Sequence, residues 1–160
     1  MHHQPGRTPA RLKDRPTWLI SRAYARSSGL LNAGFEAHGN GLRGYHYRLL
    51  AALDEYGPAS QADLGRSTGI DRSDVTAALG ELELRNLIER AVDPENKRRN
   101  IVTLTSEGID QLRDLDTLVD TIQDELLAPL TAAQRRQFTA LISRLADDPS
   151  QASYPRSPEA

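Results

Sequence analysis

The 160-residue sequence predicts a mostly α-helical fold with one small β hairpin, and three patterns support this prediction. Apolar residues recur every three or four positions through most of residues 17–146, which is the period of an amphipathic helix. Within residues 60–87, two short helical segments are separated by a turn that contains glycine, as in a helix-turn-helix. Directly after them, two short segments of strand-like composition are joined by a polar loop.

The N-terminal quarter of the chain predicts an arm followed by two helices. Residues 1–16 contain three prolines and little apolar material, so we expect a flexible arm. The first helix is expected to begin near Pro16, because proline favours the first turn, and to end before the breaker cluster at 38–41. A second helix over about 42–55 ends at Gly57-Pro58. Residues 17–57 are therefore assigned to dimerisation and support helices.

Residues 58–105 predict the most distinctive unit. Ser60, with Asp63 three positions later, forms an approximate capping box for a short helix that ends at Gly69. Asp71 is expected to cap the next helix. Residues 87–92 and 101–104 then predict two strands, with a polar, basic loop between them. A basic hairpin directly after a helix-turn-helix is typical of a wing, so we predict a winged helix-turn-helix lobe.

The C-terminal part predicts two further helices. Thr105 or Ser106 begins a long helix with an apolar stripe from Ile109 to Leu126 and an acidic opposite face. After a break at Pro129, Thr131 and Gln134 form the capping box of a last helix. The stripe could pack on its own domain, but we expect part of it to need a partner chain. Residues 106–146 are assigned to dimerisation and 147–160 to a disordered tail. The expected homodimer interface contains Leu19, Ile122, Leu126, Phe138, Leu141 and Leu145.

Composition restricts the class of protein. Hydrophobic residues make up 38% and charged residues 26%, with a net charge of −2, which fits a globular protein. No apolar run approaches the roughly 18–20 residues that a membrane span needs, and residues 1–5 lack the apolar core of a signal peptide. The absence of cysteine excludes disulfides and thiolate metal sites. We therefore expect a cytoplasmic protein with no membrane partner.

Signatures of catalysis and of metal binding are scarce. We find no glycine-rich phosphate loop, nucleophile elbow or metal-ligand spacing. Of the four histidines, two lie in the predicted arm, and His46 is expected at the edge of the core. Asp114 and Asp116 are expected on a solvated face. The prediction is therefore a protein that is not an enzyme, with no catalytic residue, metal or cofactor.

Double-stranded DNA is the predicted partner. Small hydrogen-bonding side chains at the start of the second helix of the helix-turn-helix suit entry into the major groove. The hairpin tip carries three consecutive cations, and an arginine there can enter a narrow minor groove. The alternatives are ordinary helical packing and a solvated charge run. The predicted DNA-contact residues are Ser60, Gln61, Arg72, Ser73, Asp74, Thr76, Ala77, Lys97, Arg98 and Arg99.

Several motifs resemble those of the MarR (multiple antibiotic resistance) regulators. In the wing and the following helix, Asp93-Pro94-x-Asn96-Lys97-Arg98 precedes Val102-x-Leu104-Thr105-x-x-Gly108. In the helix-turn-helix, Gln61-Ala62-Asp63-Leu64-Gly65 precedes Ile70-Asp71-Arg72-Ser73-x-Val75-Thr76. The resemblance covers about residues 17–146.

The resemblance implies a triangular dimer whose two lobes straddle a palindromic DNA site. It also implies repression that a small, often phenolic, ligand relieves. Ser73 and Thr76 would face DNA, and Arg98 would be the wing-tip arginine. The family often has arginine where Ala77 stands, so the base readout is expected to differ. The wing is expected to be shaped by Asp93, which can pair with an arginine, and by Asn96, which replaces the usual acidic residue and can still accept a hydrogen bond.

A candidate ligand site combines two aromatic side chains, a cation and an imidazole. Trp18, Arg22, Tyr45 and His46 could bind an aromatic acid, with the rings stacking and a cation pairing with the carboxylate. The alternative is that these residues only pack the junction between the dimerisation helices and the lobe.

The sequence therefore predicts a sequence-specific transcriptional regulator, a repressor of palindromic operators that a small ligand releases. One alternative is a constitutive or architectural DNA-binding protein without a ligand. The other is a winged-helix module for protein interaction, which the net charge favours slightly.

Overall fold

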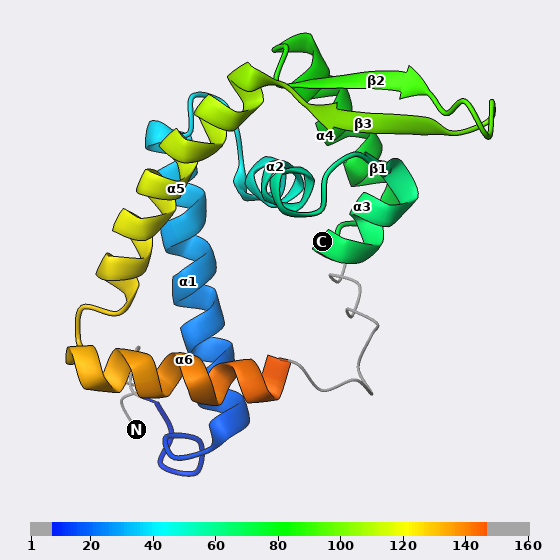
Figure 1. The fold of residues 1–160 in the computed structure, drawn as a ribbon. Coiled ribbons are helices and arrows are strands. Elements are labelled where there is room, and N and C mark those ends of the chain that lie inside the picture. Colours follow the sequence, from blue (N-terminus) through cyan, green and yellow to red (C-terminus); the bar gives the residue numbers. More distant parts are fainter. Residues whose placement is uncertain (1–7, 147–160) are drawn as a thin grey trace, which may run out of the picture.

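The computed structural model describes residues 8–146, which form six helices and a small sheet (Figure 1). The predicted tail and the first seven residues of the predicted arm lie outside this range. In chain order the elements are α1 (Pro16–His38), α2 (Gly44–Tyr56), β1 (Ala59–Ser60), α3 (Gln61–Thr68), α4 (Arg72–Leu84), β2 (Ile88–Val92), β3 (Asn100–Leu104), α5 (Ser106–Leu126) and α6 (Ala132–Ala146). The predicted mostly helical fold with a β wing is confirmed.

The helix ends follow local rules that the sequence displays. The Ser60 side chain accepts a hydrogen bond from the Asp63 N–H at the start of α3, and Gly69 ends that helix with a left-handed φ of 66°. Thr105 caps α5 through the Gly108 N–H. Asp71 occupies the predicted capping position of α4, but its side chain accepts no hydrogen bond from the helix.

The capping box that begins α6 is reciprocal, as predicted. The backbone N–H of Thr131 donates to Gln134 Oε1 at 2.9 Å, and the backbone N–H of Gln134 donates to Thr131 Oγ1 at 3.3 Å.

The sheet has three antiparallel strands in the order β1-β3-β2, one more than the sequence predicted. The wing strands β2 and β3 pair from Ile88↔Leu104 to Val92↔Asn100. The additional strand β1 has only two residues, with Ala59 opposite Val102. A two-residue strand is too short to show an alternating pattern, so only tertiary pairing reveals it.

The core of the lobe lies where α2, α3 and α4 meet the sheet. Leu49, Leu50, Val75, Leu79 and Val102 are each 0% exposed. These residues come from α2, α4 and β3, so apolar faces of separate elements share a single interior. The helix-turn-helix and the wing thus form one packed unit.

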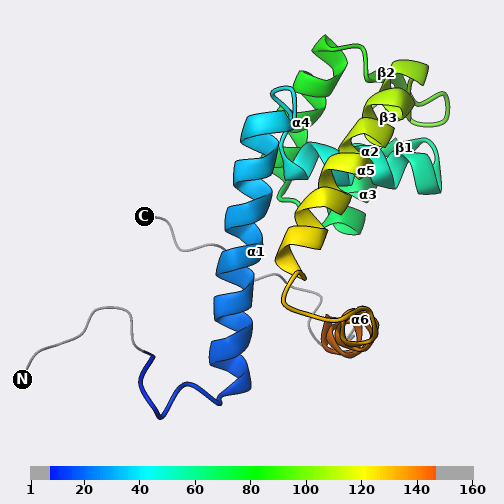
Figure 2. The same cartoon turned by 90° about the vertical axis from the view of Figure 1, so that its left-hand side faces the viewer.

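The apolar stripe of α5 packs on its own chain, along α1 and α2. Figures 1 and 2 show α1 and α5 running side by side. Their close approach occurs at Gly34, where a Cβ atom would lie 2.5 Å from Ile122 Cδ1. Ile122 is therefore a core residue with 7% exposure, which corrects its assignment to the dimer interface.

The α6 helix lies across the far end of the molecule, away from the lobe (Figure 1). None of its side chains is buried. Its exposed apolar side chains include Leu141 (53%) and Leu145 (64%), together with Phe138 and Ile142. The beginning of α1 is similar, with Leu19 and Ile20 both about half exposed. Among the helices described here, none is both long and apolar enough to cross a membrane.

Candidate nucleic-acid interface

The outer face of α4 carries the predicted major-groove residues. Arg72, Ser73, Asp74, Thr76 and Ala77 are all exposed. The same helix buries the alternate face, which holds Val75, Ala78, Leu79 and Leu82 against the core. The first turn and a half of α4 therefore presents small and polar side chains on a rigid support, as entry into a DNA groove requires.

Two predicted contact residues precede α4, and the structure separates their roles. Ser60 is only 6% exposed, because it caps α3 and its hydroxyl donates to the Asp63 carboxylate. This burial corrects the prediction that Ser60 contacts DNA. Gln61, the first residue of α3, is half-buried, and its side-chain amide donates to Thr76 Oγ1 on α4.

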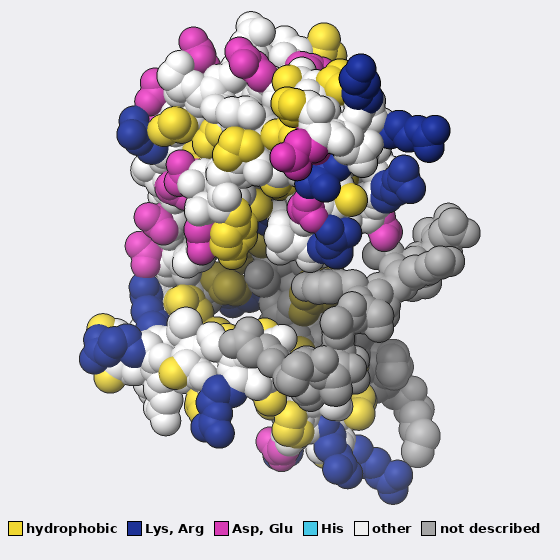
Figure 3. Space-filling view, turned by 45° about the vertical axis from the view of Figure 1, so that its right-hand side comes forward, with side chains coloured by type: hydrophobic (Ala, Val, Ile, Leu, Met, Phe, Trp, Pro, Cys, Tyr) yellow, Lys and Arg dark blue, Asp and Glu magenta, His cyan; other side chains and the backbone are white. Residues whose placement is uncertain are grey.

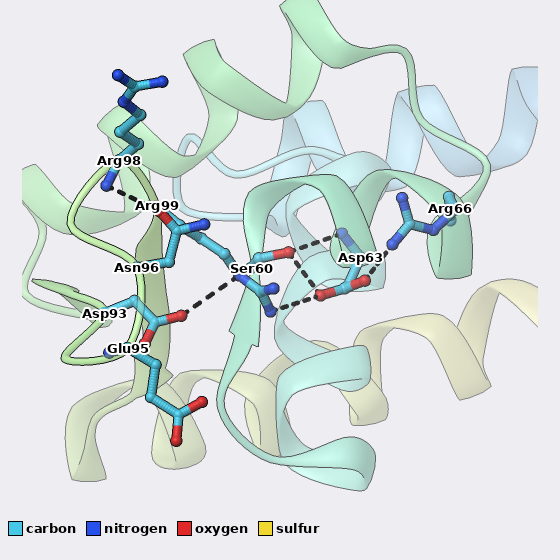
Figure 4. A network of polar contacts seen from close by, with 8 residues as sticks. All are labelled: Ser60, Asp63, Arg66, Asp93, Glu95, Asn96, Arg98 and Arg99. Carbon is cyan, nitrogen blue, oxygen red and sulfur yellow. Dashed lines mark hydrogen bonds and ion pairs between the residues drawn. The ribbon is translucent and has the colours of Figure 1, made fainter.

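The wing tip is held by its own hydrogen bonds. The backbone N–H of Asp93 donates to the Arg99 carbonyl at 2.8 Å, and that of Arg99 donates to the Asn96 carbonyl at 2.9 Å. The Asn96 side chain accepts from the Arg98 N–H at 3.1 Å, so the predicted acceptor role of Asn96 is confirmed. In Figure 4 the Arg98 side chain extends away from this network.

Arg99 joins the wing to the helix-turn-helix. Its guanidinium lies 3.6 Å from the Asp93 carboxylate and 3.2 Å from the Asp63 carboxylate on α3 (Figure 4). The predicted pairing of Asp93 with an arginine is thus confirmed, and the partner is Arg99. The Ser60 hydrogen bond, followed by the charges of Arg66 and Arg99, lowers the pKa of Asp63. Arg99 is therefore a positioning residue, and Lys97 and Arg98 are the freer cations.

A second clamp between the wing and α4 was not predicted. Arg90 on β2 donates two hydrogen bonds to one carboxylate oxygen of Glu83 on α4, one of them from Nε at 2.9 Å. This interaction lowers the pKa of Glu83 and raises that of Arg90. The two residues lie on either side of a turn, and their spacing of seven gives no local signal in the sequence.

The cations of the lobe gather where the wing and the helix-turn-helix meet the solvent. In Figure 3, Lys and Arg side chains cluster on the side that carries the wing and α3. Arg66, Arg72, Lys97 and Arg98 are exposed. Such a local footprint can bind phosphates despite the negative net charge, since charges interact over about 8–10 Å at ordinary salt.

The four predicted ligand residues do not form one site within the chain. Trp18 and Arg22 lie in the first two turns of α1, whereas Tyr45 and His46 begin α2 near the opposite end of α1 (Figure 1). At 1.5 Å per residue, the 16 residues from Arg22 to His38 span about 24 Å. The periodicity of the sequence predicts that each pair lies on a helix, but it does not predict the distance between the two pairs.

His46 is fully buried and serves the packing of α2 against the lobe. Its Nδ1 accepts a hydrogen bond from the Arg43 N–H at 2.9 Å, so the ring proton is on Nε2. Nε2 lies 2.9 Å from the Glu81 carboxylate on α4, although outside regular hydrogen-bond geometry. Burial lowers the pKa of His46, and Glu81 only partly offsets this effect. His46 is thus a neutral link between α2 and α4.

Tyr47 and Asp116 make a similar link between α2 and α5. The Tyr47 hydroxyl donates to Asp116 Oδ1 at 2.9 Å, and Asp116 itself is exposed, as predicted. Burial, with the Asp116 hydrogen bond second, raises the pKa of Tyr47 to about 12. The tyrosine therefore stays protonated and keeps donating at any physiological pH.

Other sites for small ligands or metals are sparse in the described part of the chain. An open cleft of about 530 Å³ lies where α4, β2 and the start of α5 meet. None of the four predicted ligand residues lines it. Residues 8–146 contain no group of three His, Asp or Glu side chains that could hold a metal ion.

Comparison with known proteins gives a consistent result. A model of the MarR family matches residues 40–99, from just before α2 to the wing. The HTH-type transcriptional repressor NicR of Pseudomonas putida is 26% identical over 140 residues, which cover 88% of this chain and 87% of NicR. NicR is thus named as a regulator of transcription.

Solved structures agree in both fold and length. A probable transcriptional regulator from Pseudomonas aeruginosa is 32% identical with a TM-score of 0.74, covering 84% of this chain and 99% of that one. The PcaV regulator of Streptomyces coelicolor, solved with its natural ligand, is 26% identical with a TM-score of 0.71, covering 89% and 99%. The likeness therefore extends beyond the lobe to the helices that flank it.

Proposed function

Because this chain belongs to the MarR family of transcriptional regulators, we propose that it is a homodimeric repressor of palindromic operators that a small ligand releases. In this proposal residues 58–105 are the DNA-binding lobe, and residues 17–57 and 106–146 supply dimerisation and support. The observation that carries the proposal is the position of two free polar surfaces on one rigid lobe. They are the outer face of α4 and the cations of the wing tip.

The lobe can contact two grooves of DNA at once. Ser73 and Thr76 on α4 suit base edges in the major groove. Arg98 makes no ion pair within residues 8–146, so its charge is available to the minor groove or to a phosphate. Arg99 and Arg90 clamp the wing to α3 and α4, which fixes the spacing between the two contacts.

Dimerisation is supported by the apolar surface that residues 8–146 of one chain leave uncovered. The α6 helix exposes Leu141 and Leu145, and α1 exposes Leu19 and Ile20. Exposed apolar patches of this kind mark protein interfaces. With a two-fold axis in this region, two lobes would project toward half-sites of opposite orientation, separated by about 34 Å or one turn of DNA.

The proposal of repression and of release by a ligand is supported by the relatives. NicR is named a transcriptional repressor, and PcaV has a natural ligand. We take a small aromatic acid as the class of effector to test first. Since Trp18 and Arg22 lie far along α1 from Tyr45, and both nitrogens of His46 face the chain itself, the four residues are not proposed as one pocket.

Sequencing the DNA that the protein retains from its own genome tests the central claim. We expect a palindromic site bound with steep salt dependence, and sedimentation should show a dimer. Retention of DNA without a sequence preference would favour an architectural role. A lack of salt-dependent binding would favour a protein-interaction module and would refute the proposal.

A titration of salicylate-like acids against the operator-bound dimer tests the effector. A thousandfold loss of affinity needs about 4 kcal/mol of coupling, which exceeds what one site usually supplies and calls for both sites of a dimer. The Arg22→Ala variant is titrated in parallel. If it releases DNA to the same extent as the wild-type protein, Arg22 at the N-terminal end of α1 does not take part in binding the acid. Unchanged binding up to millimolar acid would remove aromatic acids from the proposal.

A further inference from the structure

One hydrogen-bonded pair connects the two helices of the helix-turn-helix on their exposed side. Gln61 begins α3, and Thr76 lies just over one turn into α4. The side-chain amide of Gln61 donates to the Thr76 hydroxyl oxygen, and this hydroxyl donates in turn to the Arg72 carbonyl at 2.9 Å. Thr76 is exposed and Gln61 half-buried, so both border the surface proposed to face DNA.

These hydrogen bonds determine which polar groups of Gln61 and Thr76 remain available to contact DNA. A hydroxyl has a single proton, and that of Thr76 is used by Arg72. Thr76 can therefore only accept from Gln61, which fixes the glutamine amide with its NH₂ group toward Thr76 and leaves Oε1 directed elsewhere. Thr76 retains its methyl group and one lone pair for a base edge, but no donor.

The free groups of Gln61 match adenine. After one amide N–H is given to Thr76, the side chain keeps its second N–H and its carbonyl oxygen. Adenine presents an acceptor at N7 and a donor at N6 in the major groove, and glutamine pairs with both at once. Holding the amide in one orientation before binding reduces the entropy lost when that bidentate contact forms.

Resting on the proposed function, in which α4 enters the major groove, we propose that Gln61 and Thr76 act as one specificity-determining pair. Gln61 hydrogen-bonds N7 and N6 of an adenine in each half-site. The Thr76 methyl group contacts the 5-methyl group of a nearby thymine, while its hydroxyl orients Gln61. The operator should therefore contain an adenine and a thymine whose recognition depends on these two side chains.

Base analogues in the retained operator test the pair directly. Each adenine of one half-site is replaced in turn by 7-deazaadenine, which lacks the N7 acceptor, and each thymine by uracil, which lacks the methyl group. For the wild-type protein we expect one deaza substitution to weaken binding about tenfold. One uracil substitution should weaken it about fourfold, the value of one buried methyl group. Fluorescence anisotropy at constant salt measures both.

Three variants separate the two roles. In Gln61→Ala the deazaadenine penalty should vanish at that position only. Thr76→Ser keeps the hydroxyl and loses the methyl group, so the uracil penalty should vanish while the deazaadenine penalty remains. Thr76→Val keeps a methyl group and loses the hydroxyl, so the uracil penalty should remain while the deazaadenine penalty shrinks, because the glutamine amide is no longer held in one orientation. Gln123→Ala, exposed on α5, is the matched control and should leave both penalties unchanged.

Two results would overturn the pairing while leaving the proposed function intact. The wild-type protein could bind its operator with no deazaadenine penalty at any adenine. Alternatively, Gln61→Ala could weaken all duplexes by one common factor and keep the penalty, which would make Gln61 a phosphate contact. If the wild-type protein retains no operator at all, the proposed function itself fails and this inference fails with it.

Discussion

The winged lobe and the distal helices differ in where their apolar side chains are buried. In the core that α2 shares with the lobe, Leu49, Leu50 and Leu79 are completely covered by their own chain. In α6 no side chain is buried, and Leu145 is 64% exposed. Burial of apolar surface is the main source of folding stability. The lobe and α2 thus share a core, whereas the apolar side chains of α6 are left uncovered by the described residues.

A carboxylate placed on α6 should have the largest effect on this difference. We expect Leu141→Asp or Leu145→Asp to give monomers or insoluble protein. Each buried unpaired carboxylate costs several kcal/mol, and a two-fold interface contains it twice. Sedimentation at micromolar concentration measures the result. Ala140→Asp on the opposite face of α6 is the control, and monomeric wild-type protein would contradict the dimer.

Truncating a core side chain tests the other half of the comparison. Leu50 is 0% exposed, so Leu50→Ala should lower the free energy of unfolding by about 2–5 kcal/mol through lost packing and a residual cavity. Leu84, which is 87% exposed, is the control, and Leu84→Ala should change stability by about 0.5 kcal/mol or less. Urea denaturation followed by circular dichroism measures both. Equal losses would mean that the core shared by α2 and the lobe is not the main source of stability.

His46 predicts a pH dependence of stability in the core that α2 shares with the lobe. Burial lowers the folded-state pKa of His46 below the ordinary value of 6.5. Just below pH 6.5 the unfolded chain therefore binds a proton at His46 that the folded chain does not bind. Stability should therefore fall as the pH drops below about 6.5, by at most about 1.4 kcal/mol per pH unit. Urea unfolding from pH 7.5 to 5.5 measures this slope.

The range above pH 5.5 isolates the histidine. Asp63, Glu83 and Glu107 have lowered pKa values, so their contribution to stability is lost only as the pH falls below the ordinary carboxylate range. His46→Gln should flatten the slope, whereas His38→Gln, at an exposed site, should not. An unchanged slope in His46→Gln would show that another group titrates.

Arg98 gives the smallest expected effect and tests whether the wing touches DNA. One lost phosphate or groove contact per subunit should reduce the slope of log affinity against log salt by about 0.9, or twice that in a dimer. We expect Arg98→Ala to weaken binding to all sequences to a similar degree. Arg113→Ala on α5 is the control, since Arg113 pairs with Asp110 away from the lobe. If Arg98→Ala retains full affinity and slope, the wing tip does not contact DNA.

Features set by neighbours in the chain could be predicted from the sequence. Examples are the Ser60 cap, the left-handed turn at Gly69 and the reciprocal pair of Thr131 and Gln134. The order of helix-turn-helix and wing follows from the same local rules. Each of these features depends on residues within about four positions, where the spacing alone fixes the geometry.

Features that join distant segments were decided by the tertiary structure. Periodicity identified the apolar stripe of α5 but not the element against which it packs. In the structure Ile122 of this stripe packs against Gly34 on α1. The charge pattern offered three wing cations. Only the packing of α3 beside the wing gives Arg99 two carboxylates, while Arg98 has no ion pair among the described residues. A sequence fixes which face of an element is apolar or charged, whereas the surface it meets depends on how the elements pack together.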